Sequence, residues 1–154
     1  CFIGQLDMAA FLKSQIKPKK GEIRLFDTDK LIGKHDGVAY YTIGQRHGLN
    51  IADGKGPYYI AAKDINKNII YVGEEKDLET KSTKITGINW INENIKFPLE
   101  VVVKVRYRTR EQEAVLSKNG VLKFKKSVRA ITPGQSAVFY KGEEMLGGGV
   151  ILAS

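Results

Sequence analysis

The amino-acid sequence predicts a mainly β protein that begins with one short helix and divides into two strand-rich blocks. From residue 22 onward, apolar and polar residues mostly alternate, and β-branched and aromatic residues lie between Gly, Asn and Asp turns. Only residues 5–16 show the three-to-four-residue apolar spacing of a helix. Residues 74–82 hold almost no apolar side chain, so we expect a boundary there, with domains at 1–76 and 81–154.

The composition is that of a globular protein with a basic surface. The 154 residues are 42% hydrophobic and 27% charged, which excludes a disordered chain. Lys and Arg number 25 against 17 Asp and Glu, a net charge of +8 that favours an acidic partner such as nucleic acid as much as it favours solubility alone. No apolar run approaches the roughly 20 residues of a membrane helix. The single cysteine permits no internal disulfide, and we expect a cytoplasmic protein that binds no membrane.

The predicted elements follow in order along the chain. Good helix formers fill residues 5–16, and Pro18 ends that helix. The expected strands are Glu22–Phe26, Gly37–Thr42, Tyr58–Lys63, Ile69–Gly73, Ile85–Trp90, Glu100–Thr109, Glu113–Ser117, Val121–Lys125, Ser136–Tyr140 and Gly149–Leu152.

Turn signals connect these strands. Asn119-Gly120 predicts a tight hairpin turn with two positive-φ residues, and residues 64–68 predict a second hairpin. The glycine-rich residues 44–56 predict a long functional or flexible loop. Residues 132–135, Thr-Pro-Gly-Gln, predict a turn, although Gln135 just after it has the groups to bind a base or a phosphate. Gly147-Gly148-Gly149 lacks the pattern of a phosphate-binding loop and predicts a close approach of strands.

The clearest functional signal lies in residues 100–110. If these residues form one strand, Lys104, Arg106, Arg108 and Arg110 share one face. From residue 100 to residue 130, nine basic residues outnumber three acidic ones. Arg guanidinium groups suit phosphate oxygens, and the neighbouring Tyr107 offers a ring for stacking on a base. The pattern favours RNA binding over a solvated strand edge.

Other reactive side chains give weaker signals. His35 and His47 stand apart from cysteines and paired carboxylates, so no metal site is expected. We expect a surface imidazole in a turn at His35 and a surface role for His47 in the glycine-rich loop. Cys1 is the only strong nucleophile, and its common role would be that of a small buried hydrophobe. Catalysis by Cys1 stays open, including that of a processed N-terminal-nucleophile hydrolase.

Nine short motifs span nearly the whole sequence in a fixed order. They are Cys1–Gly4, Gly33–Gly37, Tyr41–Leu49, Lys63-Asp64, Tyr71–Gly73, Val105–Arg108, Arg129–Gln135, Ala137–Tyr140 and Leu146–Gly149. With these motifs the chain resembles the C-terminal part of the tRNA-specific 2-thiouridylases, enzymes that place sulfur on the wobble uridine of certain tRNAs. A chain that begins at Cys1 without an initiator Met fits the expectation of a longer parent.

The resemblance implies both architecture and chemistry. The parent has an N-terminal ATP-pyrophosphatase domain, a small central β-rich domain and a C-terminal β-barrel similar to one in elongation factors, and this sequence matches the last two. ATP adenylates the uridine, a cysteine persulfide from a sulfur-relay protein supplies sulfur, and Cys1 matches the sulfur-carrying cysteine. The family's tRNA contacts fall on Arg106, Tyr107 and Gln135, to which the charge pattern adds Lys104 and Arg108.

The same resemblance implies limits for the isolated chain. ATP would bind the absent domain, so we expect no cofactor on this chain, no activity of the chain alone, and a monomer. The alternative from the class of binding modules is a free-standing RNA-binding β-barrel related to translation factors.

Overall fold

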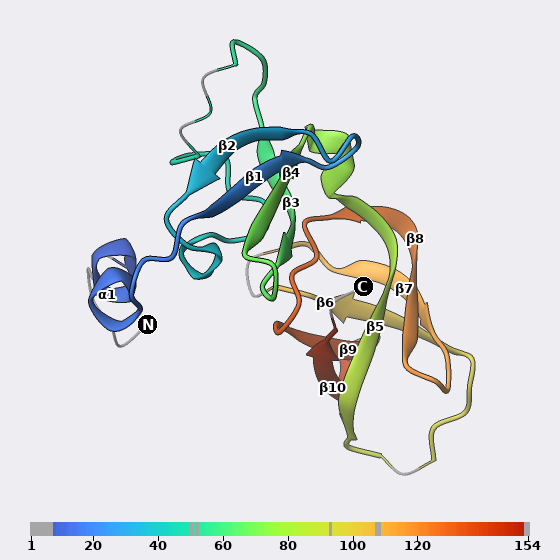
Figure 1. Ribbon diagram of the computed structural model, residues 1–154. Helices are drawn as coiled ribbons and strands as arrows, with labels where there is room; N and C mark the ends of the chain where they lie inside the picture. The colour runs from blue at the N-terminus through green and yellow to red at the C-terminus, as the bar shows by residue number, and fades with distance from the viewer. Residues whose placement is uncertain (1–7, 50, 52, 93, 107–108, 153–154) are drawn as a thin grey trace. The chain divides into compact units, whose positions relative to one another are not determined.

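The computed structural model describes residues 8–49, 51, 53–92, 94–106 and 109–152. The chain forms two compact units, Cys1–Leu78 and Glu79–Ser154. The first holds a four-stranded sheet and the second a closed barrel of six strands (Figure 1). The prediction of a mainly β protein with one short α-helix is confirmed for the described residues: α1 spans Met8–Gln15, and residues 5–7 of the predicted helix lie outside them. Within the same residues, no helix is both long enough and apolar enough to cross a membrane.

The sheet of the first unit has the strand order β2-β1-β4-β3. Its strands are β1 (Gly21–Leu25), β2 (Leu31–His35), β3 (Tyr59–Asp64) and β4 (Ile69–Gly73). β1 pairs antiparallel with β2 and parallel with β4, and β3 pairs antiparallel with β4, which confirms the hairpin predicted around residues 64–68. The fully buried Ile23, Ile60, Ile70 and Val72 form the core of this unit.

The predicted strand at 37–42 is wrong, and β2 was not predicted. Residues Val38–Tyr40 form a 3₁₀ helix, η1. The Gly37 N–H donates to His35 Nδ1 at 2.9 Å, and the Val38 N–H donates to Asn68 Oδ1 at 3.1 Å. Side chains therefore satisfy the backbone donors that a strand would have given to a neighbouring strand.

The second unit closes in the strand order β10-β5-β8-β7-β6-β9. Its strands are β5 (Glu79–Trp90), β6 (Leu99–Lys104), β7 (Gln112–Leu116), β8 (Val121–Arg129), β9 (Ser136–Lys141) and β10 (Glu144–Ile151). Alternate residues point inward and fill the barrel, among them the fully buried Val103, Leu116, Leu122 and Phe139. Two short elements, η2 (Glu75–Leu78) and the first residues of β5, occupy the polar stretch 74–82, which is therefore not an irregular linker.

Three predicted details of the barrel are corrected. β5 begins six residues before the predicted Ile85, and β10 begins five residues before the predicted Gly149. The β7–β8 hairpin forms as predicted, but its turn differs. Gly120 has a φ of 80°, as predicted, but Asn119 does not have a positive φ. The Gly120 N–H donates to the Ser117 carbonyl and the Ser117 N–H to the Val121 carbonyl, so the connection has three residues with one left-handed position.

Candidate nucleic-acid interface

The strand that carries the basic residues ends earlier than the sequence predicts. β6 stops at Lys104, and the chain turns at Arg106, whose carbonyl accepts the Thr109 N–H at 3.2 Å and the Thr109 hydroxyl at 3.0 Å. The prediction that Lys104, Arg106, Arg108 and Arg110 line one strand face is therefore wrong. Tyr107 and Arg108 lie outside the described residues.

Lys104 forms its contacts on the outside of the barrel. Its Nζ lies 2.9 Å from Glu111 Oε1 and 5.4 Å from the centre of the Tyr140 ring. The hydrogen bond to Glu111, and then the attraction of that carboxylate, raise the pKa of Lys104. Since 40% of the side chain stays exposed, the ion pair is weak and open to competition by another anion.

Arg106 contacts a second segment of the barrel, between β8 and β9. Its Nη2 donates to the Ala130 carbonyl at 2.6 Å and to Thr132 Oγ1 at 2.8 Å, and its Nε donates to Gln135 Oε1 at 3.3 Å. Ala130 has a φ of 53°, an uncommon value for a residue with a Cβ, and its carbonyl also accepts the Thr132 hydroxyl at 3.1 Å. The half-buried guanidinium thus joins the β6 end to the 130–135 segment.

Gln135 lies directly after a tight turn. The Gln135 N–H donates to the Thr132 carbonyl at 3.3 Å, and Gly134 has a φ of 82°, which confirms the turn predicted for 132–135. The Gly134 N–H donates to the Ile151 carbonyl at 2.8 Å, and the Ile151 N–H donates to the Gln135 carbonyl at 2.9 Å. The structure therefore brings together two residues, Arg106 and Gln135, that the sequence resemblance names as tRNA contacts.

Comparisons with known proteins agree with this architecture. The model of the tRNA methyl transferase PRC-barrel domain matches residues 9–74, and that of the aminomethyltransferase beta-barrel domain matches residues 80–151. Across 98% of its length the chain is 42% identical to the tRNA-specific 2-thiouridylase of Mycoplasma capricolum, and 38% identical to that of Bacillus licheniformis. The chain belongs to the tRNA-specific 2-thiouridylase family. It spans 44% and 43% of the length of these two relatives, so it corresponds to less than half of each.

Several candidate functional residues that the sequence analysis named in this 2-thiouridylase family member are not part of the Arg106–Gln135 site. Cys1 lies outside the described residues. His47 is exposed in the 44–56 segment, which forms no helix or strand where it is described. In the part of the chain that the structure describes, no three His, Cys, Asp or Glu side chains gather in a way that could hold a metal ion.

His35 is buried, so the prediction of a surface imidazole is wrong. Only 3% of the residue is exposed. Its Nδ1 accepts the Gly37 N–H, so Nε2 carries the proton and donates to the Asn68 carbonyl at 3.2 Å. Burial lowers the pKa of His35, which keeps the ring neutral. His35 therefore has a structural role, since both of its ring nitrogens bond to backbone groups of the first unit.

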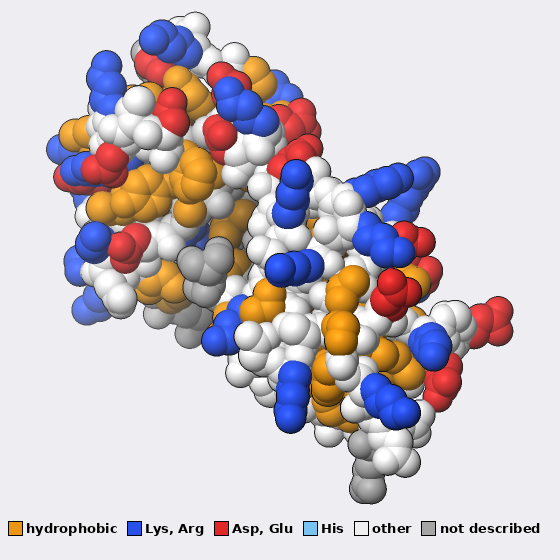
Figure 2. Space-filling view, turned by 90° about the vertical axis from the view of Figure 1, so that its right-hand side faces the viewer, with side chains coloured by type: hydrophobic (Ala, Val, Ile, Leu, Met, Phe, Trp, Pro, Cys, Tyr) orange, Lys and Arg blue, Asp and Glu red, His pale blue; other side chains and the backbone are white. Residues whose placement is uncertain are grey.

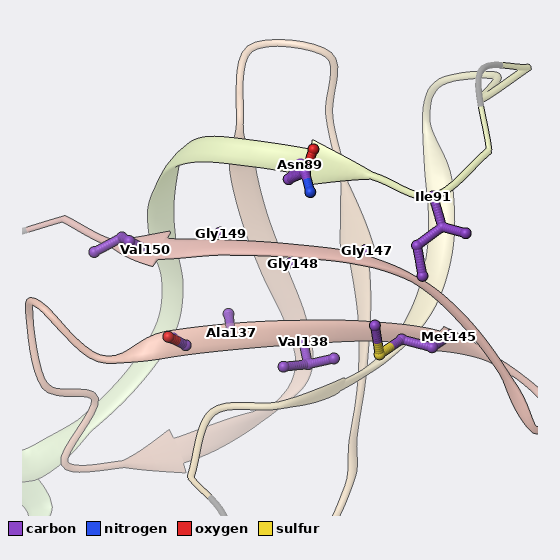
Figure 3. A pocket seen from close by; sticks show the side chains of 10 residues that line it. Asn89, Ile91, Ala137, Val138, Met145, Gly147, Gly148, Gly149 and Val150 are labelled. Atoms are coloured by element: carbon purple, nitrogen blue, oxygen red, sulfur yellow. The ribbon is translucent and has the colours of Figure 1, made fainter.

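The three consecutive glycines of β10 allow the strands of the barrel to approach closely, as predicted. A Cβ on Gly147 would lie 2.3 Å from the Asn89 carbonyl oxygen, and one on Gly149 would lie 2.6 Å from Ile85 Cγ2. Figure 3 shows the resulting surface hollow, with Ile91 and Met145 at one end of the glycine stretch and Val150 at the other. The hollow is mostly apolar and presents no cluster of charged groups.

Basic side chains also cover other parts of the barrel. Lys123, Lys125, Lys126 and Arg129 are exposed on β8, and Lys125 pairs with Glu113 at 3.3 Å. Figure 2 shows that Lys and Arg side chains on one face are interspersed with Asp, Glu and uncharged side chains instead of forming a continuous patch.

Proposed function

We propose that this chain is the C-terminal part of an enzyme that thiolates the wobble uridine of tRNA at C2, and that its barrel binds the tRNA. The observation that carries the proposal is the Arg106–Gln135 contact, on a closed barrel in a chain related to tRNA-specific 2-thiouridylases. Two residues that resemble the family's tRNA contacts lie 29 positions apart in the sequence and are in contact. The proposal places the protein in the cytoplasm, as a monomer.

Different residues of the barrel would make different kinds of contact with RNA. Tyr107, next to Arg106 in sequence, supplies a ring that can stack on a base, and Arg108 supplies a fork for a phosphate. Lys104 contributes a weaker phosphate contact, because Glu111 competes for its ammonium group.

Cys1 would carry sulfur in the complete enzyme. ATP adenylates the C2 oxygen of the uridine in the domain that this sequence does not contain. A sulfur-relay protein leaves a sulfane sulfur on Cys1 as a persulfide, whose terminal sulfur would attack C2 and expel AMP. The family's other catalytic cysteine, in the absent domain, would then attack the Cys1 sulfur, which forms a disulfide and leaves the transferred sulfur on the uridine. A thiolate can hold and release sulfane sulfur, whereas a hydroxyl cannot. The 154 residues alone, with one cysteine and no ATP loop, are proposed to be inactive in thiolation.

The tRNA-binding part of the proposal is tested by affinity as a function of salt. The 154-residue chain should bind an unmodified tRNA transcript without ATP, and log K should fall linearly with log salt by about 0.7–0.9 per phosphate contact. Lys104→Gln with Arg108→Gln should flatten that slope by about one to two contacts.

A control variant separates a local site from net charge. Lys30→Gln with Lys34→Gln removes two exposed positive charges from the first unit, the same change in net charge. If both double variants flatten the slope equally, binding depends on overall charge and the assigned surface is wrong. If the wild-type chain fails to bind at low salt, the tRNA-binding proposal fails.

The role of Cys1 is tested in the full-length enzyme that contains this chain. Cys1→Ser should abolish incorporation of labelled sulfur into tRNA and leave adenylation and tRNA affinity largely intact. A purely packing role predicts instead a loss of about 1–3 kcal/mol in stability with turnover still measurable. Thiolation that survives in the Cys1→Ser enzyme would refute the sulfur-carrying role.

A further inference from the structure

We infer that Arg106 is a positioning residue, which fixes the Gln135 carboxamide so that its NH₂ group faces outward as a donor to an acceptor atom of RNA. The inference rests on the proposed tRNA binding and deepens it. It assigns the direct contact to Gln135 and an indirect role to Arg106.

The chemistry of the two side chains determines the orientation of the amide. A guanidinium has N–H donors and no acceptor, so only the amide oxygen of Gln135 can face it. Arg106 Nε donates to Gln135 Oε1 at 3.3 Å. Because Oε1 accepts from Arg106, Nε2 is the terminal atom of the carboxamide that is left to donate to another group. Among the described residues, Nε2 has no hydrogen-bond partner.

The backbone of Gln135 is held on two sides, so its side-chain torsions are the main freedom that remains. Its N–H donates to the Thr132 carbonyl at 3.3 Å, and its carbonyl accepts the Ile151 N–H at 2.9 Å. The contact with Arg106 restrains those torsions before RNA arrives. Ordering a long side chain in advance lowers the entropy lost on binding.

The contacts of Arg106 argue against a direct phosphate clamp. Nε and Nη2 form one of the two edges of a guanidinium that bind an anion in bidentate fashion. That edge is occupied by Gln135 Oε1, the Ala130 carbonyl and Thr132 Oγ1. A phosphate could take it only by breaking the contacts that hold the 130–135 segment.

Gln135→Glu is the sharpest test, because it keeps an acceptor for Arg106 and removes the donor. The variant should melt at or above the wild-type temperature, since the carboxylate pairs with Arg106. Its affinity for an unmodified tRNA transcript should fall by about tenfold or more, through the lost hydrogen bonds and the added negative charge. Gln135→Ala removes the donor without adding charge, and should weaken binding by about five- to tenfold.

A double-mutant cycle distinguishes positioning from direct contact. If Arg106 acts through Gln135, Arg106→Met weakens tRNA binding in the wild-type background but changes it less than twofold in the Gln135→Ala background. If Arg106 touches a phosphate, the two losses add and the salt slope falls by about one contact in either background. Melting curves of all four proteins show whether each variant is folded at the temperature of the assay. Should Arg106→Met unfold, Arg106→Lys replaces it in the cycle.

The outcomes separate this inference from the proposal beneath it. If the wild-type chain binds no tRNA, both fail together. If it binds and Gln135→Glu binds equally well, or the cycle is additive, the inference alone is overturned. If Gln135→Ala lowers the affinity equally for tRNAs of different sequence, the acceptor is a phosphate or sugar. If the loss of affinity varies with sequence, the acceptor is a base edge.

Discussion

Replacing Asn68 with alanine should destabilise the first unit more than any other single polar substitution we can identify among its described residues. Asn68 is 8% exposed and ends the β3–β4 hairpin turn. Its Nδ2 donates to the carbonyls of Lys19 at 2.9 Å and Lys20 at 3.0 Å, and its Oδ1 accepts the Val38 N–H at 3.1 Å. One side chain thus ties the start of β1 and η1 to β4.

The expected magnitude follows from these three bonds and the backbone. A typical intramolecular hydrogen bond contributes about 1 kcal/mol, so the three contribute about 3 kcal/mol. Asn68 also has a φ of 56°, where asparagine is tolerated and an alanine costs about 1 kcal/mol more. Asn68→Ala should therefore lower the free energy of unfolding by about 3–4 kcal/mol. This is a large part of the about 5–15 kcal/mol that stabilises an ordinary domain.

Two further variants separate the contributions. Asn68→Gly loses the same bonds but adopts the positive φ freely, so it should be about 1 kcal/mol more stable than Asn68→Ala. Asn68→Asp keeps the acceptor for Val38 but turns a carboxylate oxygen toward two carbonyl oxygens, so it should be at least as destabilised as the alanine variant.

Urea denaturation followed by far-ultraviolet circular dichroism measures the change. Trp90 is the only tryptophan of the chain and lies in the barrel, so its fluorescence reports barrel unfolding in the same titration. Protection of the Val38 amide from hydrogen exchange reports the first unit directly. A free energy of unfolding for Asn68→Ala within 1 kcal/mol of the wild type would refute this reasoning.

Two other substitutions test the electrostatics and the packing. His35 has a pKa below its ordinary value of 6.5 because it is buried, so the unfolded chain binds its proton first as the pH falls. The free energy of unfolding of the first unit should be at its full value above pH 6.5 and should decrease below it. His35→Gln should remove this pH dependence, whereas the exposed His47→Gln should retain it. A flat profile between pH 5 and 8 would contradict this reasoning. Gly147→Ala should lower the urea midpoint read by Trp90 far more than Gly142→Ala, because a Cβ meets the Asn89 oxygen at 2.3 Å in the first and open space in the second. Equal midpoints for these two variants would show that the strands can move apart at little cost.

Alternation of apolar and polar residues predicted the strands that bury one face, and it failed where local hydrogen bonds replaced strand pairing. β7 and β9 match the expected segments within one residue at each end. Residues 105–109 continue the alternating pattern, yet β6 ends at Lys104, and the N–H and hydroxyl of Thr109 bond to the Arg106 carbonyl. Periodicity describes which face is apolar and carries no information on such a competing turn.

Long-range contacts explain why the environment of single side chains was mispredicted. His35-Asp36-Gly37 is a sound turn signal, and a turn does follow β2. The imidazole is nevertheless buried, because the carbonyl of Asn68, 33 residues away, accepts its Nε2 proton. Likewise, Arg106 contacts the carbonyl of Ala130, which has a φ of 53°, a left-handed conformation that the residue preference of alanine would not suggest.

The candidate site unites two motifs that the sequence presents separately. Val105–Arg108 and Arg129–Gln135 are distinct segments of the chain, and the first was interpreted through its charges and the second through its turn. In the structure, Arg106 bonds to three residues of the second motif and so links the two segments. An arginine chosen from the sequence as a phosphate ligand is therefore first a structural link. RNA would bind a surface whose polar groups are already oriented. The conformational entropy of these groups is then lost during folding and not during binding.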